Sequence, residues 1–407
     1  MTARTLPTLL LLASATLAAG CAEQLSSMKD TATGWFGDEE QKAQEKAEEK
    51  RLAPAELDKE FKPKIAVKKL WDGRFGKGSQ ELYLKLLPAA YENHVFTADR
   101  DGRVMAIDGS TGKVVWEERD KKRRISGGPG VGEGKVYVGT SEAQVLARDA
   151  ATGKKVWVAD VSSEVLAPPR AANGIVAVRT GDGKLYALNA ETGVEKWVFD
   201  RTIPTLTLRG TAPAVIHDDM ILAGFDNGRL SALSLDSGLE LWETRLAEPS
   251  GRSELERLVD IDAEPVIRDG TAYIDSFQGR VAAVSLSDGS LEWTRDISSY
   301  VDVAVDEDNV YVADERGYVW ALARSDGASV WQQRAFKNRA LTGPLRYRGY
   351  VVVGDFEGYL HWLDAGTGEV VARERVGKER IIATPIDIGG AVAGYGSDGK
   401  MAAFSAD

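Results

Sequence analysis

Short apolar runs broken by glycine-containing turns follow one another from residue 64 onward. In one unit the runs cover residues 215–225, 229–235 and 239–245, and Asp-Asn-Gly and Asp-Ser-Gly separate them. Short runs rich in β-branched and aromatic residues predict strands, and Asn-Gly or Asp-Gly between two runs predicts a tight hairpin. The pattern therefore predicts β-structure throughout this part of the chain.

The turns recur in a fixed frame, Asp-Gly-x-Val-x-Ala-x-Asp-x-x-Thr-Gly-x-x-x-Trp, which is fullest from Asp101 to Trp116. Its second glycine stands at positions 112, 153, 193, 238, 289, 327 and 368, in steps of 41, 40, 45, 51, 38 and 41 residues. Ala143 replaces the first glycine in one copy, and Ala372 replaces the tryptophan in another. Four short strands in about 40 residues are typical of a propeller blade. We interpret the recurring tryptophans as packing between neighbouring blades and the glycines as turn positions.

The two ends of the chain complement each other. Asp398-Gly399 opens an eighth copy, which stops at Asp407 before its last strand, whereas residues 64–71 read as a last strand without a unit in front of it. Pairing the two closes the ring and removes exposed strand edges. We therefore expect an all-β fold, an eight-bladed β-propeller of four-stranded blades, with the ring closed by the N-terminal strand pairing into the last blade.

The first 62 residues differ from the repeats. Residues 1–20 predict a lipoprotein signal peptide, with Arg4, an apolar stretch and small residues before Cys21. Cys21 is the only cysteine, and its place at the cleavage position predicts lipidation there; an ordinary secretory signal is the alternative. Residues 21–62 are expected to form the lipidated N-terminus and a charged flexible tether, because their charged segment lacks an apolar period. Residues 63–407 form the predicted propeller.

Composition narrows the function classes. With 62 acidic and 51 basic residues the net charge is −11, which does not favour nucleic acid as a partner. A single cysteine excludes an internal disulfide framework and a cysteine-based zinc site, and the three histidines show no ligand spacing. We predict no metal site, no cofactor and no catalytic residue.

Insertions in a repeat protein map to loops, often on the binding face. Against a base step of 41, two consecutive steps of 45 and 51 residues carry four and ten extra residues, each after the tryptophan strand. These connections should emerge beside each other on the face of the Asp-Gly hairpins. Residues 205–210 and 248–262 mix leucine, arginine and aspartate, as protein interfaces do.

The lipoprotein-type signal, the repeat and these two loops together resemble the outer-membrane assembly factor B (BamB) family of Gram-negative lipoproteins. The repeat alone is the one named after pyrroloquinoline-quinone (PQQ) enzymes. Three stretches carry the resemblance more specifically: residues 206–210, 257–262 and 353–362. Ala22 follows the cysteine, rather than the aspartate that retains such lipoproteins in the inner membrane, so the outer membrane is favoured.

The resemblance implies a non-enzymatic scaffold of the outer-membrane β-barrel assembly (BAM) machinery, anchored by its lipid and facing the periplasm. It would bind a periplasmic domain of the barrel-forming subunit and aid the folding and insertion of outer-membrane proteins. The family's binding surface uses residues that match Leu206, Leu208, Arg209, Asp260 and Asp262; we add Arg257 from its position in the same loop. Unfolded outer-membrane clients, added as strands at blade edges, are a second candidate partner.

Two other functions share the blade motif. A quinone-dependent dehydrogenase would need calcium, a catalytic carboxylate and commonly a vicinal cysteine pair, and the single cysteine does not allow such a pair. A periplasmic ligand-binding or sensing propeller would need a concave polar channel.

Overall fold

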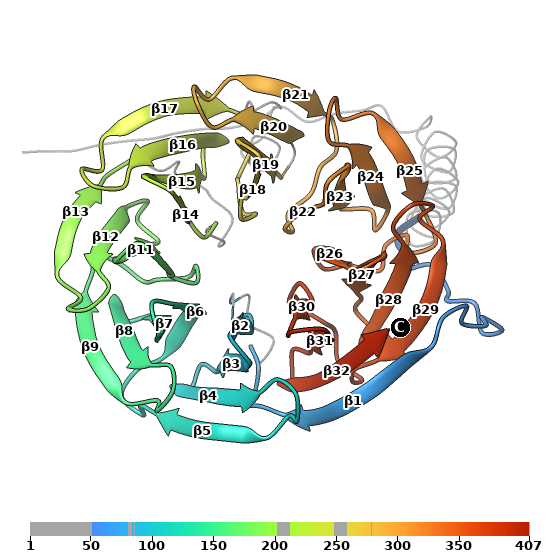
Figure 1. Ribbon diagram of the computed structural model, residues 1–407, viewed down its shortest axis with the longest axis horizontal. Helices are drawn as coiled ribbons and strands as arrows, with labels where there is room; N and C mark the ends of the chain where they lie inside the picture. Colours follow the sequence, from blue (N-terminus) through green and yellow to red (C-terminus); the bar gives the residue numbers. More distant parts are fainter. Residues whose placement is uncertain are drawn as a thin grey trace, which may run out of the picture. The chain divides into compact units, whose positions relative to one another are not determined.

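The computed structural model describes residues 51–79, 84, 86–201, 212–247, 259–277 and 279–406. The chain divides into two compact units, Met1–Ala53 and Pro54–Asp407. The second unit contains eight four-stranded sheets arranged around a centre, as Figure 1 shows. The predicted eight-bladed all-β propeller is confirmed. Within the described ranges, no helix has the length and apolarity needed to cross a membrane.

Blades 1 to 4 each place four strands in chain order from the centre outward. Their strands are β2 (Ala89–Tyr91), β3 (His94–Ala98), β4 (Arg103–Asp108), β5 (Val114–Arg119); β6 (Ile125–Gly132), β7 (Lys135–Thr140), β8 (Gln144–Asp149), β9 (Lys155–Asp160); β10 (Arg170–Ala172), β11 (Ile175–Arg179), β12 (Leu185–Asn189), β13 (Glu195–Phe199); β14 (Val215–His217), β15 (Met220–Phe225), β16 (Arg229–Ser234), β17 (Glu240–Arg245).

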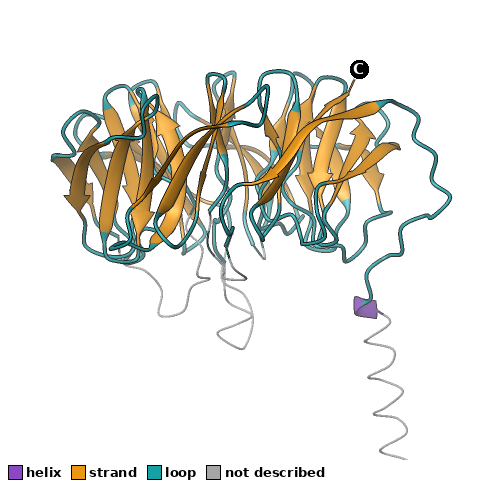
Figure 2. Ribbon diagram, turned by 90° about the horizontal axis from the view of Figure 1, so that it is seen from below, coloured by secondary structure: helices purple, strands orange, loops and turns teal. Residues whose placement is uncertain are grey.

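Blades 5 to 7 repeat this order, and blade 8 takes its outermost strand from the N-terminal side of the chain. Their strands are β18 (Val266–Arg268), β19 (Thr271–Asp275), β20 (Val281–Ser285), β21 (Leu291–Arg295); β22 (Ala304–Val305), β23 (Asn309–Ala313), β24 (Val319–Ala323), β25 (Ser329–Gln333); β26 (Leu345–Tyr347), β27 (Tyr350–Gly354), β28 (Tyr359–Asp364), β29 (Val370–Arg375); β30 (Ile386–Asp387), β31 (Val392–Tyr395), β32 (Lys400–Ala406), β1 (Val67–Arg74). Figure 2 shows the strands running between two faces that carry the turns.

The repeat anchors make the contact between neighbouring blades. Gly193 in blade 3 adopts a φ of 72°, and a Cβ atom there would lie 2.6 Å from Cε3 of Trp157 in blade 2. The Trp157 indole donates to the Ala190 carbonyl at 3.0 Å. Six other tryptophans of the same register donate in the same way to the next blade: Trp71, Trp116, Trp197, Trp242, Trp293 and Trp331. The interpretation of tryptophan as interblade packing is confirmed.

The ring closes through β1. This strand pairs antiparallel with β32, from Val67 opposite Ala406 to Arg74 opposite Lys400. Trp71 then packs on Gly112 of blade 1, as the tryptophans of the other blades do on their neighbours. The core is divided into hydrophobic clusters that lie between successive blades. The expected closure by the N-terminal strand is therefore confirmed.

The compact propeller unit starts at Pro54, so it includes residues 54–62, which the sequence assigns to the tether. The signal peptide and the lipidation residue Cys21 lie outside the described residues.

Candidate partner-binding surface

The two long connections join β13 to β14 and β17 to β18. The amide of Leu246, at the start of the second connection, donates to the carbonyl of Gly228 in the blade 4 hairpin at 2.8 Å. At its end, the Asp260 carbonyl accepts from the Phe277 amide of blade 5 at 2.9 Å. Both described ends therefore lie at the hairpins that join the second and third strands of their blades, on the face that the sequence predicts.

Six residues are predicted to bind a partner, and the structure describes two of them. Leu206, Leu208, Arg209 and Arg257 lie outside the described residues, in the ranges 202–211 and 248–258. Asp260 and Asp262 are both buried, at 0% and 7% exposure. Between them, Ile261 packs against Gly224 of β15 and belongs to the core between blades 4 and 5. The segment around Asp260 is thus held in the propeller body.

Phe225, at the end of β15, lies between two guanidinium groups. Its ring centroid is 4.1 Å from Arg179 Cζ and 5.1 Å from Arg201 Cζ. Arg179 ends β11 in blade 3, and Arg201 follows β13 at the start of the first connection. Stacking of this kind adds about 0.5–2 kcal/mol per pair, more where water is excluded. The aromatic ring therefore joins blades 3 and 4 at the base of the first connection.

Arg179 is a buried positive charge near the second connection. Its side chain is 2% exposed, and none of its three nitrogens makes a hydrogen bond within the described part of the chain. Its Nη2 lies 3.9 Å from Asp226 Oδ1. Burial lowers the pKa of Arg179, and the charges of Asp226 and Asp262 oppose this shift. Asp262 therefore lies within electrostatic reach of Arg179, and the bases of the two connections meet here.

Arg201 also ties the first connection to the strand from which the second one leaves. Its Nη2 lies 2.7 Å from Glu240 Oε1, and its Nη1 pairs with Glu243; both glutamates belong to β17. Arg229 of β16 pairs with the other oxygen of Glu243. Glu243 of β17 thus binds two guanidinium groups. Through Arg201, the start of the first connection is fixed to the strand from which the second connection leaves.

Arg179 and Phe225 were not predicted as site residues, although the sequence holds a signal for this place. The residue three positions before the first anchor glycine is aspartate in blades 1, 6 and 7, where it closes the hairpin; Asp314 Oδ1, for example, accepts from the amides of Arg316 and Tyr318 at 2.9 and 2.8 Å. In the other five blades this position holds Thr140, Thr180, Phe225, Ser276 and Gly396. Phe225 is the only aromatic residue among the eight positions, and this departure marks the place between the two long connections.

Polar contacts also link the inner ends of several blades on this face. Arg170 of blade 3 pairs with Glu264, which precedes blade 5, through Nε and Oε1 at 2.7 Å and a second contact of Nη2 with Oε2. The Glu264 amide donates to Asp302 at 3.0 Å, and Thr384 Oγ1 donates to the same carboxylate at 3.1 Å. Burial opposes the charge of Arg170, but Glu264 and Asp302 raise its pKa. This brace joins blades 3, 5, 6 and 8 through the residues beside their innermost strands.

In the described ranges, no group of three or more His, Cys, Asp or Glu residues is arranged to hold a metal ion.

Comparison with known proteins relates the whole chain to one family. A family model described as "Outer membrane protein assembly factor BamB" matches residues 100–333. A protein of that name from Xanthomonas campestris pv. campestris is 40% identical over 383 residues, which cover 92% of this chain and 93% of that protein. The protein of that name from Pseudomonas aeruginosa is 44% identical over 356 residues, covering 88% and 93%.

Solved structures agree with this relation. The crystal structure of BamB from Moraxella catarrhalis has a TM-score of 0.76 and 26% identity, and the match covers 84% of this chain and all of that one. Quinohemoprotein alcohol dehydrogenase from Comamonas testosteroni has a TM-score of 0.66 at 14% identity, covering 83% and 76%. The second likeness concerns the fold alone.

Proposed function

This chain belongs to the family of outer membrane protein assembly factor BamB, and we propose from this that it is a scaffold of the outer-membrane β-barrel assembly machinery. It is not an enzyme: its relatives at 40% and 44% identity are assembly factors, whereas the quinohemoprotein dehydrogenase shares only the fold. In the proposed role the propeller binds a periplasmic domain of the barrel-forming subunit and aids the folding and insertion of outer-membrane proteins.

The proposed binding surface is the pair of long connections in blades 3 to 5. One observation carries this proposal: Phe225 stacks with Arg179 and with Arg201 of the first connection, and Arg179 lies within electrostatic reach of Asp262 in the second. Partner-binding loops need such a rigid base, because ordering a loop on binding costs affinity. The stacked Phe225 and the Glu243 ion pairs supply this rigidity.

The burial of the two aspartates defines the role we propose for them. Side chains that are 0% and 7% exposed offer almost no surface to a partner. We therefore assign Asp260 and Asp262 to positioning the second connection, and direct partner contact to Leu206, Leu208, Arg209 and Arg257. Leucine and arginine side chains supply the apolar anchors and charge-assisted hydrogen bonds of interface centres.

We further propose that an acyl group on Cys21 anchors the chain to the outer membrane on its periplasmic side. The single cysteine at the end of the export signal supports this assignment.

Affinity recovery of the barrel-forming subunit from solubilised outer membranes tests the proposal. We expect the wild-type chain to recover the subunit and Arg209→Glu to recover at least about 30-fold less, since a central interface arginine contributes about 2 kcal/mol or more. Lys121→Glu is the matched control, because Lys121 is an exposed basic residue in the equivalent connection between β5 and β6.

Three outcomes would contradict parts of the proposal. Equal recovery by Arg209→Glu would exclude the assigned surface, and no recovery by the wild-type chain would exclude the function. In the same cells, Cys21→Ser should move the chain from the membrane to the soluble fraction; if it stays with the membrane, the lipid anchor is wrong.

A further inference from the structure

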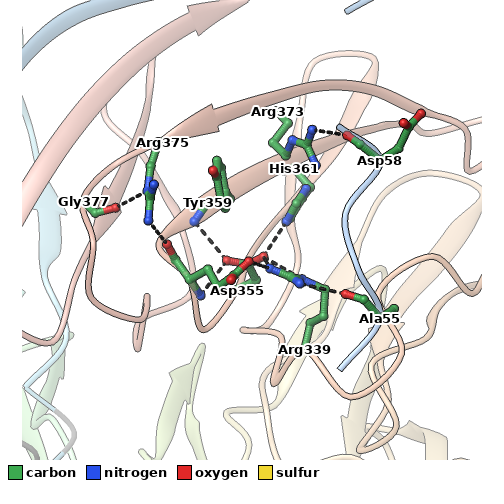
Figure 3. A network of polar contacts seen from close by, with 10 residues as sticks. Ala55, Asp58, Arg339, Asp355, Tyr359, His361, Arg373, Arg375 and Gly377 are labelled. Atoms are coloured by element: carbon green, nitrogen blue, oxygen red, sulfur yellow. Dashed lines mark hydrogen bonds and ion pairs between the residues drawn. The ribbon is translucent and has the colours of Figure 1, made fainter. Parts of the chain in front are cut away.

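Residues Pro54–Ala66, which we call the N-terminal strap, lie along blade 7 before the chain enters β1 (Figure 3). The Ala55 amide donates to the Lys337 carbonyl at 2.8 Å. Near the other end, the Lys64 amide donates to the carbonyl of Val371 in β29 at 2.7 Å. Both ends of the strap are therefore joined by backbone hydrogen bonds to residues more than 270 positions away.

Arg339, in the connection between β25 and β26, holds the first end of the strap and is itself held by the hairpin between β27 and β28. Arg339 donates to the Ala55 carbonyl through Nη1 at 2.8 Å, while its Nε and Nη2 donate to Asp355 Oδ2 at 2.9 and 2.7 Å. Its Nη2 also pairs with Glu357. Arg339 is 2% exposed and Asp355 is 0% exposed, so this is a buried, charge-assisted network that ends on a backbone carbonyl of the strap.

Arg373 of β29 holds the middle of the strap. Its Nη2 donates to the Asp58 carbonyl at 2.8 Å (Figure 3). Its guanidinium lies 5.2 Å from the ring centroid of Phe61. Leu57 packs against the hydrophobic cluster that Phe336 and Leu341 help to form between blades 6 and 7. The strap therefore contributes apolar contacts as well as hydrogen bonds.

The contact between blades 7 and 8 differs from the other interblade contacts, and this difference explains why the strap can bind at blade 7. Elsewhere a tryptophan of one blade packs on a hairpin glycine of the next, but in blade 8 the corresponding strands, β32 and β1, come from the two ends of the chain. Ala372 stands at the tryptophan position of blade 7, and Val67, at the hairpin position, joins the same hydrophobic cluster. Ile65 of the strap packs there too. The strap thus completes the contact that no hairpin supplies at the seam.

We propose that blade 7 and the connection that precedes it form an intramolecular receptor for the N-terminal strap, through Lys337, Arg339, Val371 and Arg373. The docked strap fixes the point at which the lipid tether leaves the propeller. This proposal rests on the proposed lipid anchor at Cys21. With the strap docked, only residues 21–53 separate the acyl group from the propeller, and the tether departs from blade 7.

The hydrogen bonds of Arg339 are complete only when the strap is docked. Without the strap, Arg339 would keep its two bonds to Asp355 but lose the acceptor of Nη1, and an unsatisfied donor on a buried charged group is unfavourable. Asp99 and Asp314 stand at the position of Asp355 in blades 1 and 6 and close their hairpins without a buried arginine and histidine beside them. We therefore attribute the additional partners of Asp355 in blade 7, Arg339 and His361, to the binding of the strap.

Hydrogen exchange of the full lipidated chain in detergent micelles tests the docking step. We expect Arg373→Ala to make the amides of residues 54–66 exchange at least about tenfold faster, the effect of losing one charge-assisted hydrogen bond. Arg375→Ala is the matched control: Arg375 lies on the same strand and stacks on the same Tyr359 ring, but it donates to Gly377 and Glu357 instead of the strap. Equal exchange in both variants would overturn the receptor assignment.

A second measurement tests the point at which the tether leaves the propeller. Because Cys21 is the only native cysteine and carries the acyl group in the proposed function, Lys121→Cys supplies a single free thiol for a spin label. On vesicles of phosphatidylethanolamine and phosphatidylglycerol, we expect the label-to-membrane distances to reach farther when Arg373→Ala is added, because release of the strap lengthens the tether by the length of the strap. If the distances are unchanged although exchange is faster, the docked strap does not set the point of departure and that part of the proposal is wrong. If no form binds the vesicles, the lipid anchor of the proposed function fails, while the exchange result still decides the receptor.

Discussion

One aspartate position of the repeat has different partners in different blades. In blade 6, Asp314 closes its hairpin through two backbone amides. Asp355 does the same in blade 7 through Oδ1, and its Oδ2 accepts from Arg339 and from His361 Nε2, the latter at 2.9 Å. Burial opposes ionisation of Asp355, but the hydrogen bonds from His361, Tyr359 and Arg339 keep its pKa below the ordinary value.

His361 is fully buried in this network and packs on Phe336, with ring centroids 4.4 Å apart. Burial lowers the pKa of His361; Asp355 opposes the shift, and the charges of Arg339 and Arg373 add to it. Because the unfolded chain takes up this proton at a higher pH than the folded chain, His361 stabilises the fold above its ordinary pKa of 6.5. This contribution is lost as the pH falls below that value.

We therefore expect the pH dependence of stability to change in His361→Gln, whose amide can still donate to Asp355 but cannot titrate. The wild-type chain should lose up to about 1.4 kcal/mol of unfolding free energy per pH unit below 6.5 because of this residue, and the variant should lose correspondingly less. Denaturant unfolding between pH 7.5 and 5.5 measures both slopes. His217→Gln, at a half-buried histidine of β14, is the control; parallel slopes in wild type and His361→Gln would contradict the assignment.

At the scale of the element, the second glycine of each repeat, in the hairpin between the third and fourth strands, has two roles. Its positive φ closes the turn, and its missing side chain lets the indole of the previous blade lie against the backbone, as Trp157 does on Gly193. The two roles can be separated at Gly174, which has nearly the same φ, 73° against 72°. A Cβ atom added to Gly174 would meet no other atom within 4 Å.

Gly174→Ala should therefore cost only the backbone strain, about 1–2 kcal/mol of unfolding free energy. Gly193→Ala should cost about 1–3 kcal/mol more, because its Cβ would overlap the Trp157 ring. Urea unfolding of the two variants beside the wild-type chain gives the difference. Equal losses would mean that the indole moves aside without penalty and that the contact contributes little to blade packing.

At the scale of the whole molecule, β1 makes a ring out of an open array. It covers the edge of β32 along seven paired positions and places Trp71 against blade 1. An open propeller would expose the β32 edge and remove one interblade contact, and exposed edges promote association between chains.

A chain that begins at Phe75 should thus unfold about 10 °C below one that begins at Pro54, since the loss of a buried tryptophan alone costs about 3–5 kcal/mol. It should also self-associate. Circular dichroism during heating and sedimentation velocity measure these two effects. A monomer with an unchanged midpoint would show that the seven remaining complete blades hold the ring without its closing strand.

The sequence by itself determined the number of blades, the hairpin residues and the closing strand. These properties are local or periodic. The geometry of an Asp-Gly turn depends on the residues of the turn itself, and because the units repeat, the tryptophan of one unit packs on the glycine of the next. The long connections were visible for the same reason, as departures from a constant step.

Only the tertiary structure decided which side chains meet across blades. The sequence predicts Asp260 and Asp262 as interface residues, and only the structure shows that both are buried, on either side of Ile261 in the core between blades 4 and 5. The stack of Arg179 on Phe225, the brace from Arg170 to Glu264, and the bond from Arg339 to Ala55 join residues 46 to 284 positions apart. Such contacts depend on the curvature of the closed ring, which sets the distance between blades. This curvature does not produce a periodic pattern in the sequence.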